Sequence, residues 1–344
     1  MAYRVQSSEK TASSAAEMET KALLHLLCED GDKGEIRGFA IDFFNDVTGM
    51  DSNAFRLYDV QSKGEDSGPG ALGEELVTLF KNYVSEFKDY FVEQILFVRK
   101  VTKPVLGNQV LSEFRYENLT DASKAELRRR LIEACKQKTY IDDASITDDN
   151  VDGFLANVIF VVSKKDKEDY IRPLIKTSNA FGTTPRDLRA IFNEIKKLQT
   201  GVKSSSKVEG CEVQYPSDVF TTGHVMMRKD IELLIIQRII NRNPLEAGIP
   251  VPFKSIYDAL DEDIANDRLE ACQDELALQM FAVNESAAFW ALLGEIVTLI
   301  HNQPDADVGT IYHAIPEKIL DACHQLTPLS HQYFIAIVKE GLKK

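Results

Sequence analysis

The chain has 344 residues, of which 44% are hydrophobic and 27% are charged, and its net charge is −14. This length and composition predict two domains with buried cores, and the acidic balance argues against a protein that binds nucleic acid over its whole surface. The N-terminus is polar, and the longest apolar run, "FWALLGEIVTLI", is too short to cross a bilayer. We therefore expect a cytoplasmic protein without membrane contact.

The first hundred residues predict a mixed α/β core in the order helix, strand, strand, helix, strand. Apolar residues recur at helical spacing from Ser13 to about Glu29, and again from Leu72 to Phe87. The three predicted strands are "EIRGFAIDFF", "FRLYDVQSKG" and "QILFVRKV". The segment "NDVTGMDSN", between the first two strands, is rich in turn-forming residues and predicts a connection.

The rest of the chain predicts an extension of this core and then a helical region. A charged helix over 121–138, a strand near 157–163 and two helices up to about residue 199 follow the core. The segment "TGVKSSSKVEG" predicts a linker over 201–215. The later helical segments are "DIELLIIQRIINR", "FKSIYDALDEDIAN", "SAAFWALLGEIVTLIHN" and "SHQYFIAIVKEGLKK". The predicted architecture is an α/β domain over residues 1–200 and a mostly α-helical domain over residues 216–344.

The charges are distributed unevenly along the chain. Residues 99–200 carry a net positive charge, which includes the run Arg128, Arg129 and Arg130. A phosphate-facing surface is therefore expected in the N-terminal half, with the arginine run as a candidate nucleic-acid contact or, alternatively, a solvated helix face. Residues 201–344 are acidic, which is more typical of a surface for protein partners.

The strand "FRLYDVQSKG" ends in polar side chains that share one face. Because side chains alternate along a strand, Asp59, Gln61 and Lys63 lie on the same side. Asp42 and Asp46 stand at the end of the preceding strand, and they share a face if the chain stays extended there. Carboxylate and amide oxygens suit Mg²⁺, and a neighbouring lysine can orient water and offset charge during phosphodiester cleavage. The alternative is an ordinary solvated strand end, because Q-x-K is a short pattern.

Other catalytic patterns are absent from the sequence. The five cysteines include no C-x-x-C pair, and the six histidines include no H-x-x-x-H or H-E-x-x-H pattern. These absences argue against a zinc site and a disulfide framework. Neither G-x-x-x-x-G-K-[ST] nor G-x-G-x-x-G occurs, so the chain is not expected to use a nucleotide as fuel.

The passages "GFAIDFFNDVTGMDSNAFRLYDVQSKG" and "LVTLFKNYVSEFKDYFVEQILFV" resemble a family of bacterial double-stranded-DNA nuclease domains. These domains occur in CD-NTase-associated effectors of anti-phage systems, and they belong to the PD-(D/E)xK superfamily in its D…QxK form. The resemblance covers residues 13–100 and extends to about residue 200, but it does not include the C-terminal part. That part is similar to the helical tail of nuclease subunits in Lamassu-like, or ABC three-component, defence systems.

The resemblance implies a restriction-nuclease-like core and assigns its site residues. Gln61 and Lys63 match the Q-x-K motif, and either Asp46 or Asp42 matches the upstream acid. Glu19 on the first helix is a further candidate metal ligand, as is Asp59 on the strand itself. In the implied mechanism, the upstream acid and Gln61 position Mg²⁺ or Mn²⁺ on the scissile phosphate, and Lys63 orients the attacking water.

The implied activity is metal-dependent endonucleolytic cleavage of double-stranded DNA by an effector of a bacterial defence complex. The implied partners are an SMC-like, ABC-type ATPase and an accessory subunit, and the active form is expected to be a homo-oligomer. Two alternatives remain open. One is a non-catalytic scaffold with a relic nuclease fold. The other is an RNase of the same superfamily, because a site that acts on the phosphate group does not by itself distinguish ribose from deoxyribose.

Overall fold

The computed structural model describes residues 3–5, 13–31, 34–177, 181–205, 208–282 and 285–343. The chain divides into two compact units, here called the N-terminal and the C-terminal unit. The N-terminal unit comprises residues 1–30, 35–170 and 192–228, and the C-terminal unit comprises residues 31–34, 171–191 and 229–344. The main division therefore lies after residue 228, later than the predicted linker over 201–215.

The segment predicted as a linker folds back onto the N-terminal unit. Strand β8 (Glu212–Val213) pairs with β1 (Tyr3–Arg4) in a two-stranded antiparallel sheet. Further along, β9 (Val225–Met227) joins the edge of the main sheet beside β2. Ser206 and Lys207 of the predicted linker lie outside the described residues. The pairing of β8 with β1 and of β9 with β2 thus makes this segment part of the α/β unit.

The N-terminal unit is built on a mixed seven-stranded sheet in the order β6-β7-β5-β4-β3-β2-β9. Its central strands β2, β3 and β4 form an antiparallel meander, and β5 and β7 run parallel to β4. The strands of this sheet besides β9 are β2 (Gly38–Ile41), β3 (Val47–Met50), β4 (Leu57–Ser67), β5 (Phe91–Val101), β6 (Glu113–Arg115) and β7 (Ile159–Val162). The predicted mixed α/β core is confirmed.

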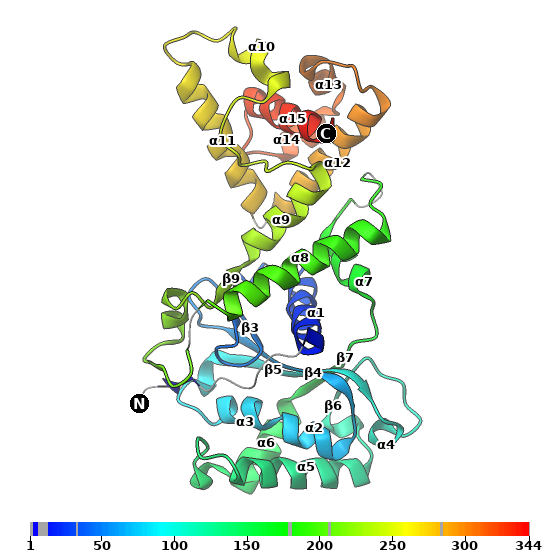
Figure 1. Ribbon diagram of the computed structural model, residues 1–344, viewed down its shortest axis with the longest axis vertical. Coiled ribbons are helices and arrows are strands. Elements are labelled where there is room, and N and C mark those ends of the chain that lie inside the picture. Colours follow the sequence, from blue (N-terminus) through cyan, green and yellow to red (C-terminus); the bar gives the residue numbers. More distant parts are fainter. Residues whose placement is uncertain are drawn as a thin grey trace. The chain divides into compact units, whose positions relative to one another are not determined.

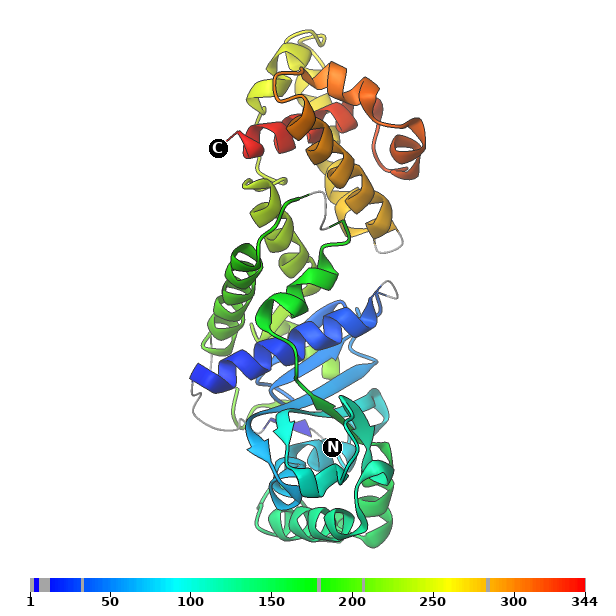
Figure 2. The same cartoon turned by 90° about the vertical axis from the view of Figure 1, so that its right-hand side faces the viewer.

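Helices cover both faces of this sheet (Figures 1 and 2). Helix α1 (Ser13–Asp30) covers one face, and the second half of α8 (Pro185–Lys203) lies beside it, where Thr20 Oγ1 donates a hydrogen bond to Gln199 Oε1 at 2.8 Å. The opposite face carries α2 (Pro69–Glu75), α3 (Val77–Tyr83), α5 (Asp121–Lys136) and α6 (Asp148–Asn157). Apolar side chains from these four helices form one buried cluster with β5 and β7, as amphipathic helices do on a sheet.

The predicted connection between the first two strands contains a strand of its own. Asp42 adopts a positive φ of 52°, and β2 ends at the preceding residue, Ile41. The chain then reverses and returns as β3. This strand packs closely at Gly49, where an added Cβ would lie only 3.0 Å from Cδ1 of Ile36. The expectation that Asp42 and Asp46 share a face along an extended chain is therefore wrong, since a turn separates them.

The C-terminal unit is helical, as predicted. Its last helix, α15 (Pro328–Leu342), is buried along most of its length. The predicted helix over 253–266 is shorter than expected: it is limited to α10 (Lys254–Tyr257), and turns follow. The other helices from residue 228 onward are α9 (Arg228–Ile240), α11 (Ala265–Phe281), α12 (Ser286–Asn302), α13 (Val308–Ala314) and α14 (Glu317–Ala322).

Short elements complete the described chain. The short α-helices are α4 (Lys103–Leu106) and α7 (Lys167–Ile171), and the 3-10 helices are Lys88–Tyr90, Tyr116–Asn118, Asp143–Ser145, Arg172–Leu174, Pro216–Thr221 and Val251–Phe253. Among the described residues, we find no single helix that is both long enough and apolar enough to cross a membrane.

The packing of α2 on α5 depends on a glycine. A Cβ on Gly73 would lie 2.4 Å from the carbonyl oxygen of Leu127 and 2.9 Å from Cβ of Arg130. We expect Gly73→Ala to lower the free energy of unfolding by about 1–3 kcal/mol, because the two helices must move apart. The matched control is Gly70→Ala on the same helix, where the nearest atom to an added Cβ is the end of the Glu126 side chain at 3.3 Å. Chemical unfolding that shows equal stability for both variants would contradict this packing.

Candidate functional site

The polar face of β4 packs against a polar stripe on α2 and α3. Residues two apart on a strand share a face, as do residues three or four apart on a helical segment. The two rows meet in three contacts, which pair Asp59 Oδ2 with Asn82 Nδ2 at 2.7 Å, Gln61 Oε1 with Thr78 Oγ1 at 3.0 Å and Lys63 Nζ with Glu75 Oε1 at 2.7 Å. The predicted shared face of the three β4 side chains is confirmed, and that face packs on helices.

Asp59 is the buried anchor of this face. Its Oδ2 accepts hydrogen bonds from Nδ2 of Asn45 and of Asn82, both at 2.7 Å, and its Oδ1 accepts one from Thr48 Oγ1 at 2.8 Å. Burial raises the pKa of Asp59 to about 6, although the three hydrogen bonds favour the charged form. With three protein donors on its carboxylate, Asp59 serves the packing of β4 on α3, rather than acting as a metal ligand.

A buried lysine extends this network to the N-terminal strand. Lys81 Nζ donates to Tyr3 Oη at 2.7 Å, and Tyr3 Oη donates to Asn82 Oδ1 at 2.7 Å. Burial lowers the pKa of Lys81 to about 8, although the charge of Asp59 acts in the opposite direction. The hydrogen bonds tie β1 to α3, so residues distant in sequence share one buried polar network.

The pKa of Lys81 predicts a pH dependence of stability. An unfolded lysine keeps a pKa of about 10.4, so the folded chain loses this proton first, and the contribution of Lys81 to stability rises as the pH increases from about 8 to 10. We expect a gain of up to about 3 kcal/mol over this range, at about 1.4 kcal/mol per pH unit. Burial raises the pKa of Tyr3 well above its ordinary value, so ionisation of Tyr3 opposes the gain only at higher pH.

Burial also raises the pKa of the thiols of Cys28, Cys135 and Cys323, which lowers the stability of every variant over the same range. Urea unfolding between pH 7.5 and 10 should therefore show the Lys81 effect as a difference: the stability of wild type and of the exposed-site control Lys88→Met should rise relative to that of Lys81→Met.

On the side of the sheet covered by α1, a second cluster gathers three carboxylates around one ammonium group. Glu19 comes from α1, Asp42 and Asp46 flank the turn between β2 and β3, and Lys203 ends α8. Lys203 Nζ lies 3.1 Å from Glu19 Oε1 and 3.6 Å from Asp42 Oδ1. Asp46 Oδ2 accepts hydrogen bonds from both the backbone nitrogen and the hydroxyl of Ser62, each at 2.8 Å. We call Glu19, Asp42, Asp46 and Lys203 the acid cluster.

Glu19 and Asp46 are buried, Asp42 and Lys203 are partly buried, and protonation equilibria in the acid cluster are shifted. Burial raises the pKa of Asp46 to about 7, and the charge of Glu19 adds to the rise, while the hydrogen bonds from Ser62 oppose it. Burial also raises the pKa of Glu19, against the opposing charge of Lys203. For Lys203, burial acts to lower the pKa, but the charges of Glu19 and Asp42 outweigh it and raise the pKa. Glu19 and Asp46 therefore hold their protons to a higher pH than ordinary carboxyl groups do.

The structure therefore divides the predicted site residues into two groups. It brings Glu19, Asp42 and Asp46 together, whereas Gln61 and Lys63 point to the other face, toward α3 and α2. Ser62, which alternates with these two residues, is the β4 side chain that reaches Asp46. Adjacent strand residues point to opposite faces, so Q-x-K and the upstream acid do not form one constellation here.

Sequence reasoning missed Lys203. This lysine lies within the segment predicted as a linker, far along the chain from the acids that it contacts. The neighbouring sequence carries no motif, and only the return of α8 beside α1 brings its ammonium group to the carboxylates. Helical periodicity ahead of residue 199 predicted the helix, but not its extension to Lys203.

Mg²⁺ or Mn²⁺ does not fit the acid cluster in this arrangement. Among the described residues, no group of three or more histidine, cysteine, aspartate or glutamate side chains is arranged to hold a metal ion. The ammonium group of Lys203 contacts two of the three carboxylates instead. The oxygen-rich composition of the cluster suits a hard divalent cation, but the arrangement of its carboxylates does not.

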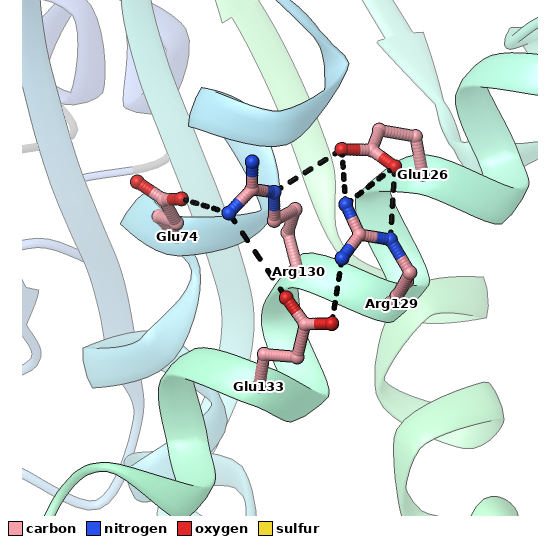
Figure 3. Close-up of polar contacts among 5 residues, drawn as sticks. All are labelled: Glu74, Glu126, Arg129, Arg130 and Glu133. Carbon is pink, nitrogen blue, oxygen red and sulfur yellow. Dashed lines mark hydrogen bonds and ion pairs between the residues drawn. The ribbon is translucent and has the colours of Figure 1, made fainter.

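The arginine run on α5 is engaged by acidic side chains. Arg129 and Arg130 form ion pairs with Glu126 and Glu133, and Arg130 also contacts Glu74 of α2 (Figure 3). The remaining member of the run, Arg128, forms ion pairs with Asp148 and Asp152 of α6, at 2.5 Å and 2.7 Å. Carboxylates outnumber guanidinium groups in this network, so the run does not present an uncompensated positive surface for phosphate. This favours the alternative of a structured, solvated helix face.

Comparisons of the chain with family models, with curated proteins and with solved structures returned no match.

Proposed function

We propose that the N-terminal unit is a DNA endonuclease and that the acid cluster is its reacting site. The observation that supports this proposal is the convergence of Glu19 from α1 with Asp42 and Asp46 from the turn between β2 and β3 at one end of the sheet, together with a partly buried lysine from α8. Buried carboxylates are costly unless they are compensated, and such clusters are concentrated at functional sites. The three carboxylates of the cluster also lie within the residues whose sequence resembles a nuclease domain.

The chain's own residues supply a proton acceptor at this site. The pKa of Asp46, raised to about 7 by burial and by the charge of Glu19, makes its carboxylate suited to accept a proton from water near neutral pH. Ser62 holds one carboxylate oxygen through two hydrogen bonds, which orients the group. The metal that the resemblance implies would supply charge stabilisation at the phosphate, but the described carboxylates of the acid cluster are not arranged to hold it.

We assign Gln61 and Lys63 to the packing of β4 rather than to the reaction. Gln61 accepts a hydrogen bond from Thr78, and Lys63 forms an ion pair with Glu75. This assignment differs from the sequence expectation, in which both residues act on the phosphate. A role in bacterial defence, with double-stranded DNA as substrate and an SMC-like ATPase and an accessory subunit as partners, rests on the resemblance alone. So does the active homo-oligomer.

A non-catalytic scaffold is the second candidate function. The observation that favours it is the use of Gln61 and Lys63 in helix packing, together with the neutralisation of the arginine run. Such a protein would keep the fold and recruit protein partners without phosphate contacts, so any residual binding to DNA would show almost no dependence on salt concentration.

Cleavage assays separate these functions. Purified full-length protein at high concentration should nick or linearise supercoiled plasmid in Mg²⁺ or Mn²⁺, and EDTA should stop the reaction. Incubation with duplex RNA tests the RNase alternative, because an RNase would cleave the RNA and leave the plasmid intact. Cutting of neither substrate under any metal condition would favour the scaffold.

A further inference from the structure

Basic side chains gather at the carboxyl ends of two neighbouring parallel strands. Arg99 and Lys100 lie near the end of β5, and Lys164 and Lys165 follow shortly after β7. The two strands are paired, so their backbones lie about 5 Å apart. Lys103, the first residue of α4, adds a fifth positive charge just beyond β5. We call Arg99, Lys100, Lys103, Lys164 and Lys165 the basic edge, and all five side chains are exposed.

The two basic residues of β5 point to opposite faces of the sheet. Arg99 shares a face with Phe97, whose ring centroid lies 5.5 Å from that of His25 on α1. Lys100 shares the other face with Val98, which belongs to the apolar cluster under α2, α3, α5 and α6. Positive charge is therefore present on both sides of this end of the sheet.

The two lysines that follow β7 also divide between the faces. Lys165 Nζ lies 5.7 Å from the ring centroid of Tyr170, whose carbonyl oxygen accepts a hydrogen bond from Cys28 of α1. Lys164 Nζ donates instead to the carbonyl oxygen of Leu111, whose side chain packs on the apolar cluster of the opposite face. Both ammonium groups contact neutral partners, so these contacts do not cancel their charge.

The basic edge keeps an excess of positive charge. Asp66 of β4 forms exposed ion pairs with Arg99 and Lys100, and two further acids, Glu65 and Asp166, lie in the adjoining segments. The five bases therefore outnumber the nearby acids, whereas carboxylates outnumber guanidinium groups around the arginine run on α5. A local positive surface on an acidic chain directs a polyanion to that surface.

The strand register places the basic edge beside the acid cluster. Ser62, whose hydroxyl donates to Asp46, is paired with Phe97 of β5. Arg99 follows Phe97 by two residues on the same face, so the Cα atoms of Ser62 and Arg99 lie about 8 Å apart by strand geometry. A phosphate backbone that crosses the basic edge would therefore pass close to the acid cluster.

We propose that the basic edge binds the sugar-phosphate backbone of duplex DNA and holds it across the end of the sheet beside the acid cluster. The inference rests on the proposed function for the choice of DNA as the polyanion. Ligands of open α/β sheets bind at the carboxyl ends of parallel strands, where this edge lies. Phosphate contacts from lysine and arginine do not read the bases, so the binding is independent of sequence and weakens steeply as salt concentration rises.

Fluorescence anisotropy with full-length protein and a short labelled duplex, in EDTA so that no cleavage occurs, tests this inference. Wild type should bind at low salt, and the double variant Lys164→Gln/Lys165→Gln should bind about tenfold or more weakly, because two phosphate contacts are lost. The slope of log affinity against log salt concentration should also become less steep by about 1.8, since each contact contributes about 0.9.

The matched control is Lys136→Gln/Lys138→Gln, which removes two exposed lysines of the same unit. Helix α5 begins beside α4, where Thr120 Oγ1 donates to the carbonyl oxygen of Pro104 at 2.9 Å. Its 16 residues carry the chain about 24 Å further, so the control should bind like wild type. Equal weakening by both double variants, unchanged affinity of Lys164→Gln/Lys165→Gln, or no binding by wild type at low salt would overturn the proposal.

A second measurement uses wild-type protein alone, in case the double variant fails to fold. Reductive methylation followed by mass spectrometry reports how accessible each lysine is. Saturating duplex DNA should lower the labelling of Lys103, Lys164 and Lys165, while that of Lys136 and Lys138 stays constant. Labelling of the basic edge that does not change with DNA would overturn the inference, and so would tighter binding of duplex RNA than of duplex DNA.

The outcome is distinguishable from failure of the proposed function, because binding is measured without metal. Salt-dependent DNA binding that requires Lys164 and Lys165, without plasmid cleavage under any metal condition, would support the basic edge and reject the nuclease. Plasmid cleavage by wild type, with unchanged DNA affinity in the double variant, would reject the basic edge and leave the nuclease in place.

Discussion

Asp46→Asn should lower metal-dependent plasmid cleavage about 100-fold or more, the range expected for removal of a general base, while the protein stays folded. The asparagine Oδ1 atom can still accept the two hydrogen bonds that Asp46 Oδ2 receives from Ser62. The charge and the proton-accepting carboxylate are lost, so the effect should fall on catalysis rather than on stability. Initial cleavage rates and thermal unfolding of the same preparation test both parts.

The matched control for Asp46→Asn is Asp66→Asn. Asp66 lies near the end of β4, where it is exposed and forms ion pairs with Arg99 and Lys100. Its replacement should leave cleavage unchanged, because exposed ion pairs contribute little. Wild-type cleavage by Asp46→Asn would show that the acid cluster does not carry the reaction.

Asp59→Ala should differ from Asp46→Asn, because its main effect should be a large loss of stability rather than a loss of cleavage. Removal of the carboxylate leaves three buried donors without their acceptor, namely the side chains of Asn45, Thr48 and Asn82. We expect the free energy of unfolding to fall by about 3–5 kcal/mol, since each unpaired buried donor costs about 1–3 kcal/mol and the losses within one network overlap.

Urea unfolding at neutral pH measures this effect, and Asp66→Ala on the same strand is its control. A loss below about 0.5 kcal/mol, the size of an ordinary surface substitution, would mean that Asp59 does not anchor β4 to α3. A stable Asp59→Ala protein that had lost cleavage would instead place Asp59 in the reacting site.

The order of elements could largely be predicted from the sequence, because it follows from local periodicity. Alternation along β4 correctly placed Asp59, Gln61 and Lys63 on one face. Alternation does not indicate which partner that face meets, and the polar stripe on α2 and α3 became apparent only in the folded chain. Polar residues at the end of a strand can therefore serve packing against a polar face of a neighbouring helix, even where their types resemble those of a catalytic site.

The candidate site was less predictable, because it depends on contacts between distant segments. Glu19 and Asp46 could be nominated from the sequence, whereas Lys203 could not, since its role arises from the return of α8. The left-handed conformation of Asp42 also departed from the extended chain that the alternating pattern predicted. Aspartate adopts this conformation more readily than most residues do, but it does so rarely, so the sequence alone did not indicate the turn at Asp42.

Plasmid cleavage by Lys63→Ala, measured beside wild type in Mg²⁺ and in EDTA, tests the central claim most directly. The claim is that the acid cluster carries the reaction and that Lys63 serves the packing of β4 on α2 through Glu75. We predict metal-dependent cleavage by Lys63→Ala at a rate within a few-fold of wild type. Complete loss of cleavage in a folded Lys63→Ala protein would contradict the claim and return the catalytic role to the Q-x-K motif.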